Sequence, residues 1–178
     1  MIYIIASVLL LAVFHFVYES IIAPSMRLEL KHRLFALRDR LRRLKLAARD
    51  DLDDRHFHYL QDSINGLIRA LDHLDLALLH RLRSARLHDA TLTSRVDSRS
   101  RILDECRIPE AVEIRGKTFR IAIEALAVNS GAWIVYLVPL LVAAAGYAEV
   151  KRLIGSVISM PPPDLLRLAS RVSPRANA

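Results

Sequence analysis

The stretch MIYIIASVLLLAVFHFVYESIIAP, residues 1–24, decides the architecture of this chain. Residues 1–18 carry no charged side chain, and the apolar character resumes after Glu19 in residues 20–23. At about 1.5 Å per residue, a helix of this length crosses the hydrocarbon core of a bilayer. Nothing basic precedes the run and a basic stretch follows it, the reverse of a cleaved secretory signal. Residues 1–24 are therefore predicted to be a retained transmembrane helix.

A second uncharged run, residues 125–148 (ALAVNSGAWIVYLVPLLVAAAGYA), lies between Glu124 and Glu149. It is long enough for a second transmembrane helix. Pro139 in its middle, and Asn129-Ser130-Gly131 near its start, favour an alternative in which the run is a re-entrant hairpin with both ends on one side. Both alternatives stay open, and so does the side on which the tail, residues 149–178, lies.

The composition requires that apolar and charged residues be segregated along the chain. Of the 178 residues, 53% are hydrophobic and 25% are charged, with a net charge of +7. The apolar content excludes a disordered chain, and the single cysteine excludes a disulfide scaffold. Lys and Arg cluster directly after the first run, so the positive-inside rule places residues 25–124 in the cytoplasm.

The basic cluster is also a predicted contact for anionic lipid headgroups, because basic residues beside a membrane are attracted to them. An acidic protein partner is a weaker alternative. Nucleic acid is unlikely as a partner, because the cluster holds one aromatic residue and resembles no nucleic-acid-binding module. The predicted lipid-binding residues are Arg27, Lys31, Arg33, Arg38, Arg42 and Arg43.

Two leucine-rich seams organise the basic module, residues 25–124, and the helix of the first seam is expected to continue the helix of the first apolar run. Each seam repeats at spacings of three and four, which is typical of one face of a helix, and the acidic residues 50–54 favour a turn between them. The pattern predicts an antiparallel, coiled-coil-like hairpin whose seams pair with each other or with further copies. The seam residues are Leu30, Leu34, Leu37 and Leu41 in the first helix and Phe57, Leu60, Leu67 and Leu71 in the second.

The rest of the chain gives weaker signals. Apolar residues are sparse from residue 83 to residue 101, so this part is expected to be a frayed or largely solvated helix. Pro109 favours the start of a final helix that leads into the second apolar run. The prolines at 161–163 and Asp164 predict that the tail contains a short amphipathic helix.

A stripe of polar residues, Ser7, His15 and Glu19, lies in or beside the first apolar run. Ionisable groups at this depth are costly unless they meet a partner or water, so the stripe can form the seam or the pore lining of an oligomer. In the milder alternative, Glu19 reaches the headgroup layer and neutral His15 bonds to a neighbour.

One pattern has the spacing of an enzyme motif. Arg83 and His88 match the arginine and histidine spacing of HEPN ribonucleases, in which this pair assists attack by a ribose hydroxyl. However, the composition of residues 24–120 gives about four such matches by chance, and four occur. His56 and His58 lie two apart on a helix and point in different directions, so no metal site is expected. No cofactor motif is present.

The sequence therefore predicts an all-α protein in which two transmembrane helices bracket a cytoplasmic helical hairpin. We expect a two-pass bacterial inner-membrane protein without enzymatic activity. The leading hypothesis is a scaffold or assembly subunit that self-associates through its leucine seams. The alternatives are an oligomeric pore or membrane-perturbing effector in stress or phage defence, and a HEPN-like ribonuclease.

Overall fold

The computed structural model describes residues 1–47, 52–130 and 147–170. Within these ranges every regular element is helical, as predicted. In chain order the elements are α1 (Ile2–Val17), the π-helix η1 (Tyr18–Ile22), α2 (Ala23–Ala47), α3 (Asp54–Ala70), the 3₁₀ turn η2 (Leu71–His73), α4 (Leu76–His88), α5 (Ala90–Glu105), α6 (Pro109–Asn129), α8 (Tyr147–Ser159) and α9 (Pro162–Ser170).

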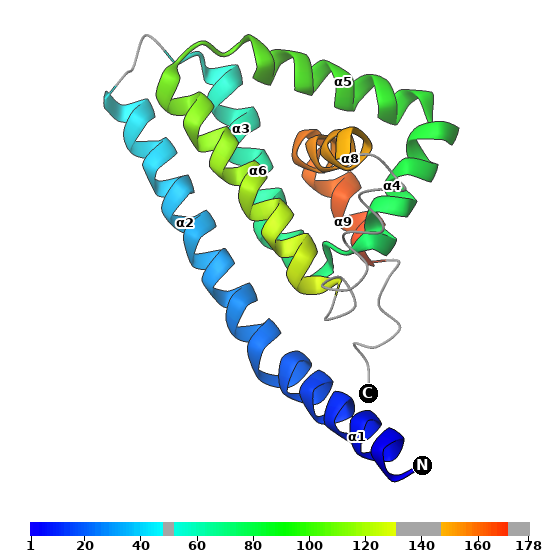
Figure 1. The fold of residues 1–178 in the computed structure, drawn as a ribbon. Coiled ribbons are helices and arrows are strands. Elements are labelled where there is room, and N and C mark those ends of the chain that lie inside the picture. The colour runs from blue at the N-terminus through cyan, green and yellow to red at the C-terminus, as the bar shows by residue number, and fades with distance from the viewer. Residues whose placement is uncertain (48–51, 131–146, 171–178) are drawn as a thin grey trace.

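α1, η1 and α2 form one continuous helix of 46 residues, Ile2–Ala47. At 1.5 Å per residue this helix is about 70 Å long. Its first third extends away from the rest of the chain, whereas α2 lies alongside α6 and α3 (Figure 1). The predicted continuation of the first apolar helix into the first leucine seam is therefore confirmed.

The body of the protein is built around α8. The helices α2, α3 and α6 lie side by side, and α8 and α9 pack against this layer (Figure 1). α4 and α5 cover the other side of α8, and α5 lies at the end of the body farthest from α1. One hydrophobic core, with Ile64, Ile114 and Ile154 fully buried, joins these layers.

The predicted hairpin differs from the observed fold in two ways. α2 packs most extensively against α6 rather than against α3. The second seam also does not follow one helix: α3 ends at Ala70, and a new helix, α4, begins after Asp75, whose carboxylate accepts a 2.7 Å hydrogen bond from the Leu78 N–H. Leu71, Leu74 and Leu78 remain buried across this break. The spacing of these leucines therefore predicts that they are buried, but it does not predict that they belong to one continuous helix.

Of the two alternatives for residues 83–101, a frayed or a largely solvated helix, the second agrees with the structure, because the segment is helical and most of its residues are exposed. These residues belong to α4 and α5, and Asp89 ends the first and caps the second by accepting a 2.9 Å hydrogen bond from the Leu92 N–H. Leu92 and Val96 are buried. A few well-placed apolar residues and one cap are thus sufficient to order this segment.

The second apolar run does not begin where the sequence suggested. Residues 125–129 are the last turns of α6, in which Ala125, Leu126 and Val128 are buried in the body. Tyr147 already begins α8. The remainder of the predicted second span or hairpin lies outside the described residues. Among the residues that the structure describes, one helix is long and apolar enough to cross a membrane, and it is the N-terminal one.

The predicted short helix of the tail is α9. It starts at Pro162, so Asp164 lies in its first turn rather than before it. The Asp164 carboxylate lies 3.2 Å from the Arg95 guanidinium of α5. This ion pair and the burial of Leu165 and Ala169 attach α9 to the body.

Candidate membrane-anchoring site

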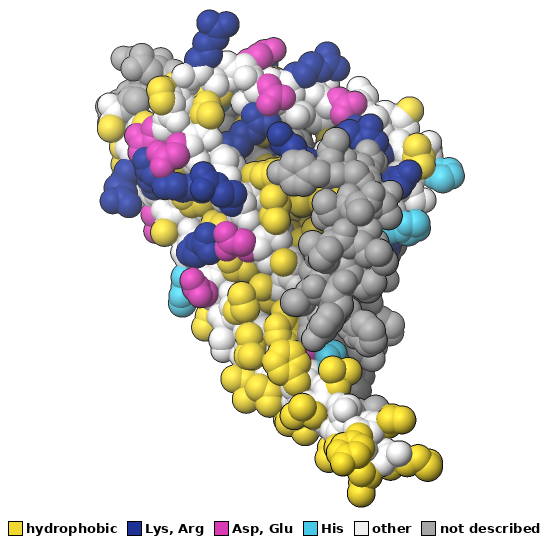
Figure 2. All heavy atoms as spheres, viewed as in Figure 1, with side chains coloured by type: hydrophobic (Ala, Val, Ile, Leu, Met, Phe, Trp, Pro, Cys, Tyr) yellow, Lys and Arg dark blue, Asp and Glu magenta, His cyan; other side chains and the backbone are white. Residues whose placement is uncertain are grey.

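Most of α1 is exposed, and in the described part of the chain its apolar side chains are not covered by another helix. None of its most apolar window is buried within the chain, and large apolar side chains cover its surface (Figure 2). Leu9, Leu10 and Phe16 keep 65%, 72% and 68% of their surface exposed. So large a continuous apolar surface requires lipid or another apolar partner. Most charged side chains visible in Figure 2 lie at the opposite, wide end of the molecule.

The polar stripe of the first apolar run is exposed as well. Ser7 donates a 2.8 Å hydrogen bond to the Tyr3 carbonyl oxygen one turn earlier, so its hydroxyl is satisfied within α1. His15 and Glu19 are exposed, and Glu19 lies in the π-helix η1. The structure thus presents all three residues outward, without bringing them into contact with the body.

A hydrogen-bonded joint attaches the end of the apolar helix to the body. The Tyr18 hydroxyl donates to the Val128 carbonyl oxygen at 3.1 Å, which satisfies an acceptor in the last turn of α6. Nine residues later, the Arg27 Nε donates to the Asn129 Oδ1 at 2.7 Å. The π-helical turn begins at Tyr18 and ends before Arg27. Its extra residue per turn rotates the side chains that follow it around the helix axis.

Asn129 is the centre of this joint. While its oxygen accepts from Arg27, its Nδ2 donates to the carbonyl oxygens of Leu71 at 2.5 Å and Leu74 at 3.2 Å. One side chain therefore connects α2, α6 and η2. Sequence reasoning missed this role, because residue 129 was interpreted only as part of the second apolar run and its partners are more than 50 residues away.

The leucine seams lie inside one copy of the chain. Phe57 is half-buried, and the other seven seam residues are buried: Leu30, Leu34, Leu37, Leu41, Leu60, Leu67 and Leu71. The seam of α2 packs between α6 and α3, so these residues form the core of a single chain. The seams are therefore not available as a surface for a second copy.

The basic cluster is largely engaged in ion pairs with other helices. Lys31 lies 2.7 Å from Asp72, and Arg33 lies 2.5 Å from Glu124 of α6. Arg40 contacts both Glu110 and Glu113 of α6 at 2.8 Å. Bonding to Arg40 and then to Lys117 lowers the pKa of Glu113 to about 2. These pairs make a charged zipper beside the buried seam.

The remaining predicted lipid-binding residues have local contacts. Arg38 lies 3.6 Å from Asp39 and stacks over the Phe35 ring, and Arg42 lies 3.9 Å from Asp39. Arg43 borders a groove beside Arg40. Residues 42 and 43 also follow residue 22 by about 30 Å along the helix axis. If α1 crosses a membrane along its normal, Arg27 is positioned for headgroups and Arg42 and Arg43 are not.

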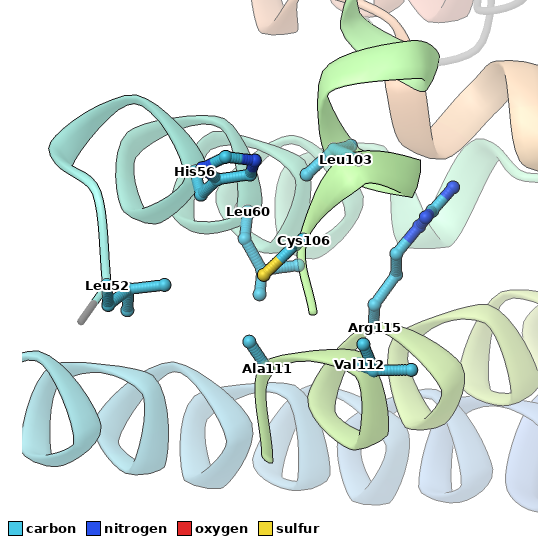
Figure 3. Close-up of a pocket in the computed structure, with 8 residues that line it drawn as sticks. All are labelled: Leu52, His56, Leu60, Leu103, Cys106, Ala111, Val112 and Arg115. Carbon is cyan, nitrogen blue, oxygen red and sulfur yellow. The ribbon is translucent and has the colours of Figure 1, made fainter. Parts of the chain in front are cut away.

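The residues considered for catalysis or metal binding do not assemble into a centre. His88 is exposed at the end of α4, with its Nδ1 2.7 Å from the Ser84 carbonyl oxygen. His56 lies beside Cys106 at a cavity of about 10 Å³, which has room for one water (Figure 3). Within the described ranges, no three His, Cys, Asp or Glu side chains come together as metal ligands would.

No family model, curated protein or solved structure matches this chain. Its function therefore has to be inferred from its own geometry. The geometry offers an unpartnered apolar helix, a polar joint that fixes this helix to the body, and a body whose core is complete within one chain.

Proposed function

We propose that this protein is a non-enzymatic membrane scaffold, in which α1 crosses the membrane once and holds the helical body on the cytoplasmic face. The observation that carries this proposal is the exposure of α1: none of its most apolar window is buried in the chain. A bilayer core of about 30 Å matches the length of residues 2–22 in helical form.

The joint at the end of α1 supports a rigid anchor rather than a tethered one. Tyr18 and Arg27 both bond to the end of α6, so the orientation of the apolar helix is fixed relative to the body. The same contacts argue against cleavage of the first 24 residues, because cleavage would remove Tyr18 from the body.

A single crossing is supported by the position of α8 and α9. α6 ends in the body at Asn129, and α8 packs against α3, α4, α5 and α6. Ile154 of α8 is fully buried there, and Asp164 of α9 pairs with Arg95. Segments that share one core lie on one side of a membrane. We therefore infer that residues 147–170 lie on the same side as α2–α6. The Lys and Arg residues after α1 favour the cytoplasm as that side.

Site-directed thiol labelling tests this topology. The chain has a single cysteine, so Cys106→Ser gives a background into which Leu87→Cys or Ser170→Cys is introduced. Both positions are exposed, one at the end of α4 and one at the end of α9. A membrane-impermeant maleimide should label both in inverted vesicles and neither in intact cells, with the protein resisting carbonate extraction.

Labelling of the two thiols from opposite sides would contradict the single crossing. Release of the full-length protein by carbonate, or its recovery as a stable particle without detergent, would contradict the anchor itself. Ser7→Cys in the same background is the matched control, because a thiol inside the bilayer should react poorly in both preparations.

Self-association remains a prediction, and the surface that it needs is different from the one the sequence suggested. The leucine seams are buried in one chain, whereas α1 is exposed and carries Ser7, His15 and Glu19. In a membrane, contacts between such polar residues favour helix association. A scaffold built from several copies would therefore associate through α1.

The same stripe supports a pore as the second candidate function. His15 and Glu19 would line an opening between copies of α1. Purified protein in dye-loaded vesicles should then release dye, and His15→Ala should change the rate of release. Vesicles that stay intact with the wild-type protein would exclude the pore and leave the scaffold.

A further inference from the structure

A polar groove of about 450 Å³ opens between α5 and α8, away from the membrane anchor. Its volume lies within the range of small-molecule sites. Four cationic side chains border it: Arg86 of α4, Arg115 of α6, and Lys151 and Arg152 of α8. Two carboxylates, Asp97 and Asp104, lie among them. The hydroxyls of Ser100, Ser156 and Ser159 complete the polar lining.

The two inner guanidinium groups are held in place by the groove itself. Arg86 lies 2.7 Å from Asp97 and donates a hydrogen bond to the Ser156 hydroxyl. Arg115 lies 2.7 Å from Asp104. The side chain of Arg86 is 20% exposed, and that of its partner Asp97 is 44% exposed. The side chain of Arg115 is 29% exposed, and that of its partner Asp104 is 63% exposed. In each pair the cation is the more buried partner, and the carboxylate faces solvent.

Donors remain for a ligand in this arrangement. A guanidinium has five N–H donors, and the recorded contacts use two on Arg86 and one on Arg115. Lys151 is exposed at the rim, and no ion-pair partner for it occurs in the described part of the chain. Guanidinium groups held in fixed positions suit phosphate oxygens, because a guanidinium binds them in pairs.

Gly155 of α8 borders the groove, and the space beside it is open. A Cβ atom added at Gly155 would meet no atom within 4 Å. The neighbours Ser156 and Arg86 place their polar atoms beside this space.

We propose that the groove between α5 and α8 binds a phosphate monoester, with Arg86, Arg115 and Lys151 contacting its oxygens. Phosphate of this kind occurs on soluble small molecules and on phosphatidic acid. The groove lies at the end of the body near α5, whereas α1 leaves the opposite end (Figure 1). This position favours a soluble phosphate compound. The site does not depend on the scaffold function, and the two can fail separately.

The test uses the full-length protein in neutral detergent, titrated with inorganic phosphate in a calorimeter at an ionic strength kept constant with chloride. We expect saturable binding by the wild type. Gly155→Gln places a side chain in the groove, with no clash at its Cβ, and should weaken binding by about tenfold or more. Lys151→Gln removes one cation at the exposed rim and should weaken it by about fivefold.

Gly116→Gln is the matched control, because Gly116 is an exposed helical glycine of α6 that also has no neighbour within 4 Å of an added Cβ. It should bind phosphate as the wild type does. Phosphate heat no larger than that of chloride, or equal binding by the wild type and Gly155→Gln, would overturn the proposal.

If circular dichroism shows that Gly155→Gln does not fold, the phosphate titration of Lys151→Gln tests the site instead. Phosphate binding by Lys151→Gln that equals wild-type binding would then overturn the proposal. A second arm titrates the same detergent-solubilised protein with a short-chain phosphatidic acid and with glycerol phosphate. Binding of the phosphatidic acid, but not of glycerol phosphate, that is weakened by Gly155→Gln would reject the soluble ligand.

Discussion

Asn129 connects three segments that are distant in the chain, and its contribution to stability can be measured. Replacement by Ala removes the acceptor of Arg27 and the donors to the Leu71 and Leu74 carbonyls, while Ala favours the helix. We expect the free energy of unfolding to fall by about 2 kcal/mol or more, because partly buried carbonyls lose their partners. Urea unfolding in detergent, followed by circular dichroism, measures this change.

The control for Asn129 is Asn65, which is half-buried on α3 and has no side-chain hydrogen bond recorded among the described residues. Asn65→Ala should change the free energy of unfolding by less than about 0.5 kcal/mol. Equal effects of the two substitutions would mean that the joint contributes nothing beyond the loss of an amide side chain.

Glu113 gives the charged zipper a dependence on pH. Its bonds to Arg40 and Lys117 lower its pKa from 4.5 to about 2, so the ionised form favours the folded chain. This contribution is complete above about pH 4.5 and is lost as the pH falls to about 2, where the folded chain is protonated too. The thermal midpoint of the wild type should therefore decrease over this range.

Glu113→Gln should make the decrease in midpoint smaller below about pH 4.5, because one of the coupled carboxylates no longer titrates. Glu105→Gln is the comparison, since Glu105 is exposed at the end of α5 and is in no ion pair that the described ranges show. A pH profile for Glu113→Gln that coincides with the wild-type profile would contradict the proposed coupling. High salt should weaken the coupling in the wild type.

At the scale of the elements, the leucine seam of α2 belongs to the core of one chain. Leu34 is fully buried between α2 and its neighbours, so Leu34→Ala should lower the free energy of unfolding by about 2–5 kcal/mol. Leu46 is on the same helix and 69% exposed, and Leu46→Ala should cost less than about 0.5 kcal/mol. Unfolding in urea distinguishes the two.

The seam variants also separate a core from an interface between copies. The mass of folded Leu34→Ala by light scattering should equal that of the wild type, because the seam contacts α3 and α6 of its own chain. A variant with halved mass and an unchanged unfolding midpoint would instead make the seam an interface between copies.

These elements show what sequence periodicity can and cannot predict. The spacing of leucines predicted which residues are buried, and the change from apolar to basic residues after residue 24 predicted a long helix with two environments. The spacing did not reveal that the axis turns between Leu71 and Asp75, because a buried row can pass from one helix to the next. Asp75 and Asp89 were the available signals, since Asp is a favoured N-cap.

The spacing of residues along the sequence could not predict contacts between segments that are far apart in the chain. Arg27 and Asn129 are 102 positions apart, and the polar groove draws on α4, α5, α6 and α8. From the sequence alone, basic residues near a predicted membrane span fitted contact with lipid headgroups as well as they fitted ion pairs within the chain. Only the fold shows that Lys31 and Arg33 have acidic partners on other elements.

For the whole molecule, α1 is the exposed apolar surface that we propose joins copies, and its two faces can be compared directly. Ser7 lies on the polar stripe, whereas Leu9 lies about 200° around the same helix and only about 3 Å deeper. Both are exposed in the single chain. In a Cys106→Ser background, Ser7→Cys should form a disulfide-linked dimer when native membranes are oxidised with copper phenanthroline, and Leu9→Cys should not.

This asymmetry follows from the cost of polar groups in lipid. Copies that associate through the stripe place Ser7, His15 and Glu19 beside each other and leave the apolar face to the acyl chains. Equal cross-linking of the two thiols would indicate random collision, and cross-linking by Leu9→Cys alone would reverse the proposed interface. If neither thiol cross-links while the protein remains membrane-bound, the scaffold acts as a monomeric anchor, and the body alone must bind its partner.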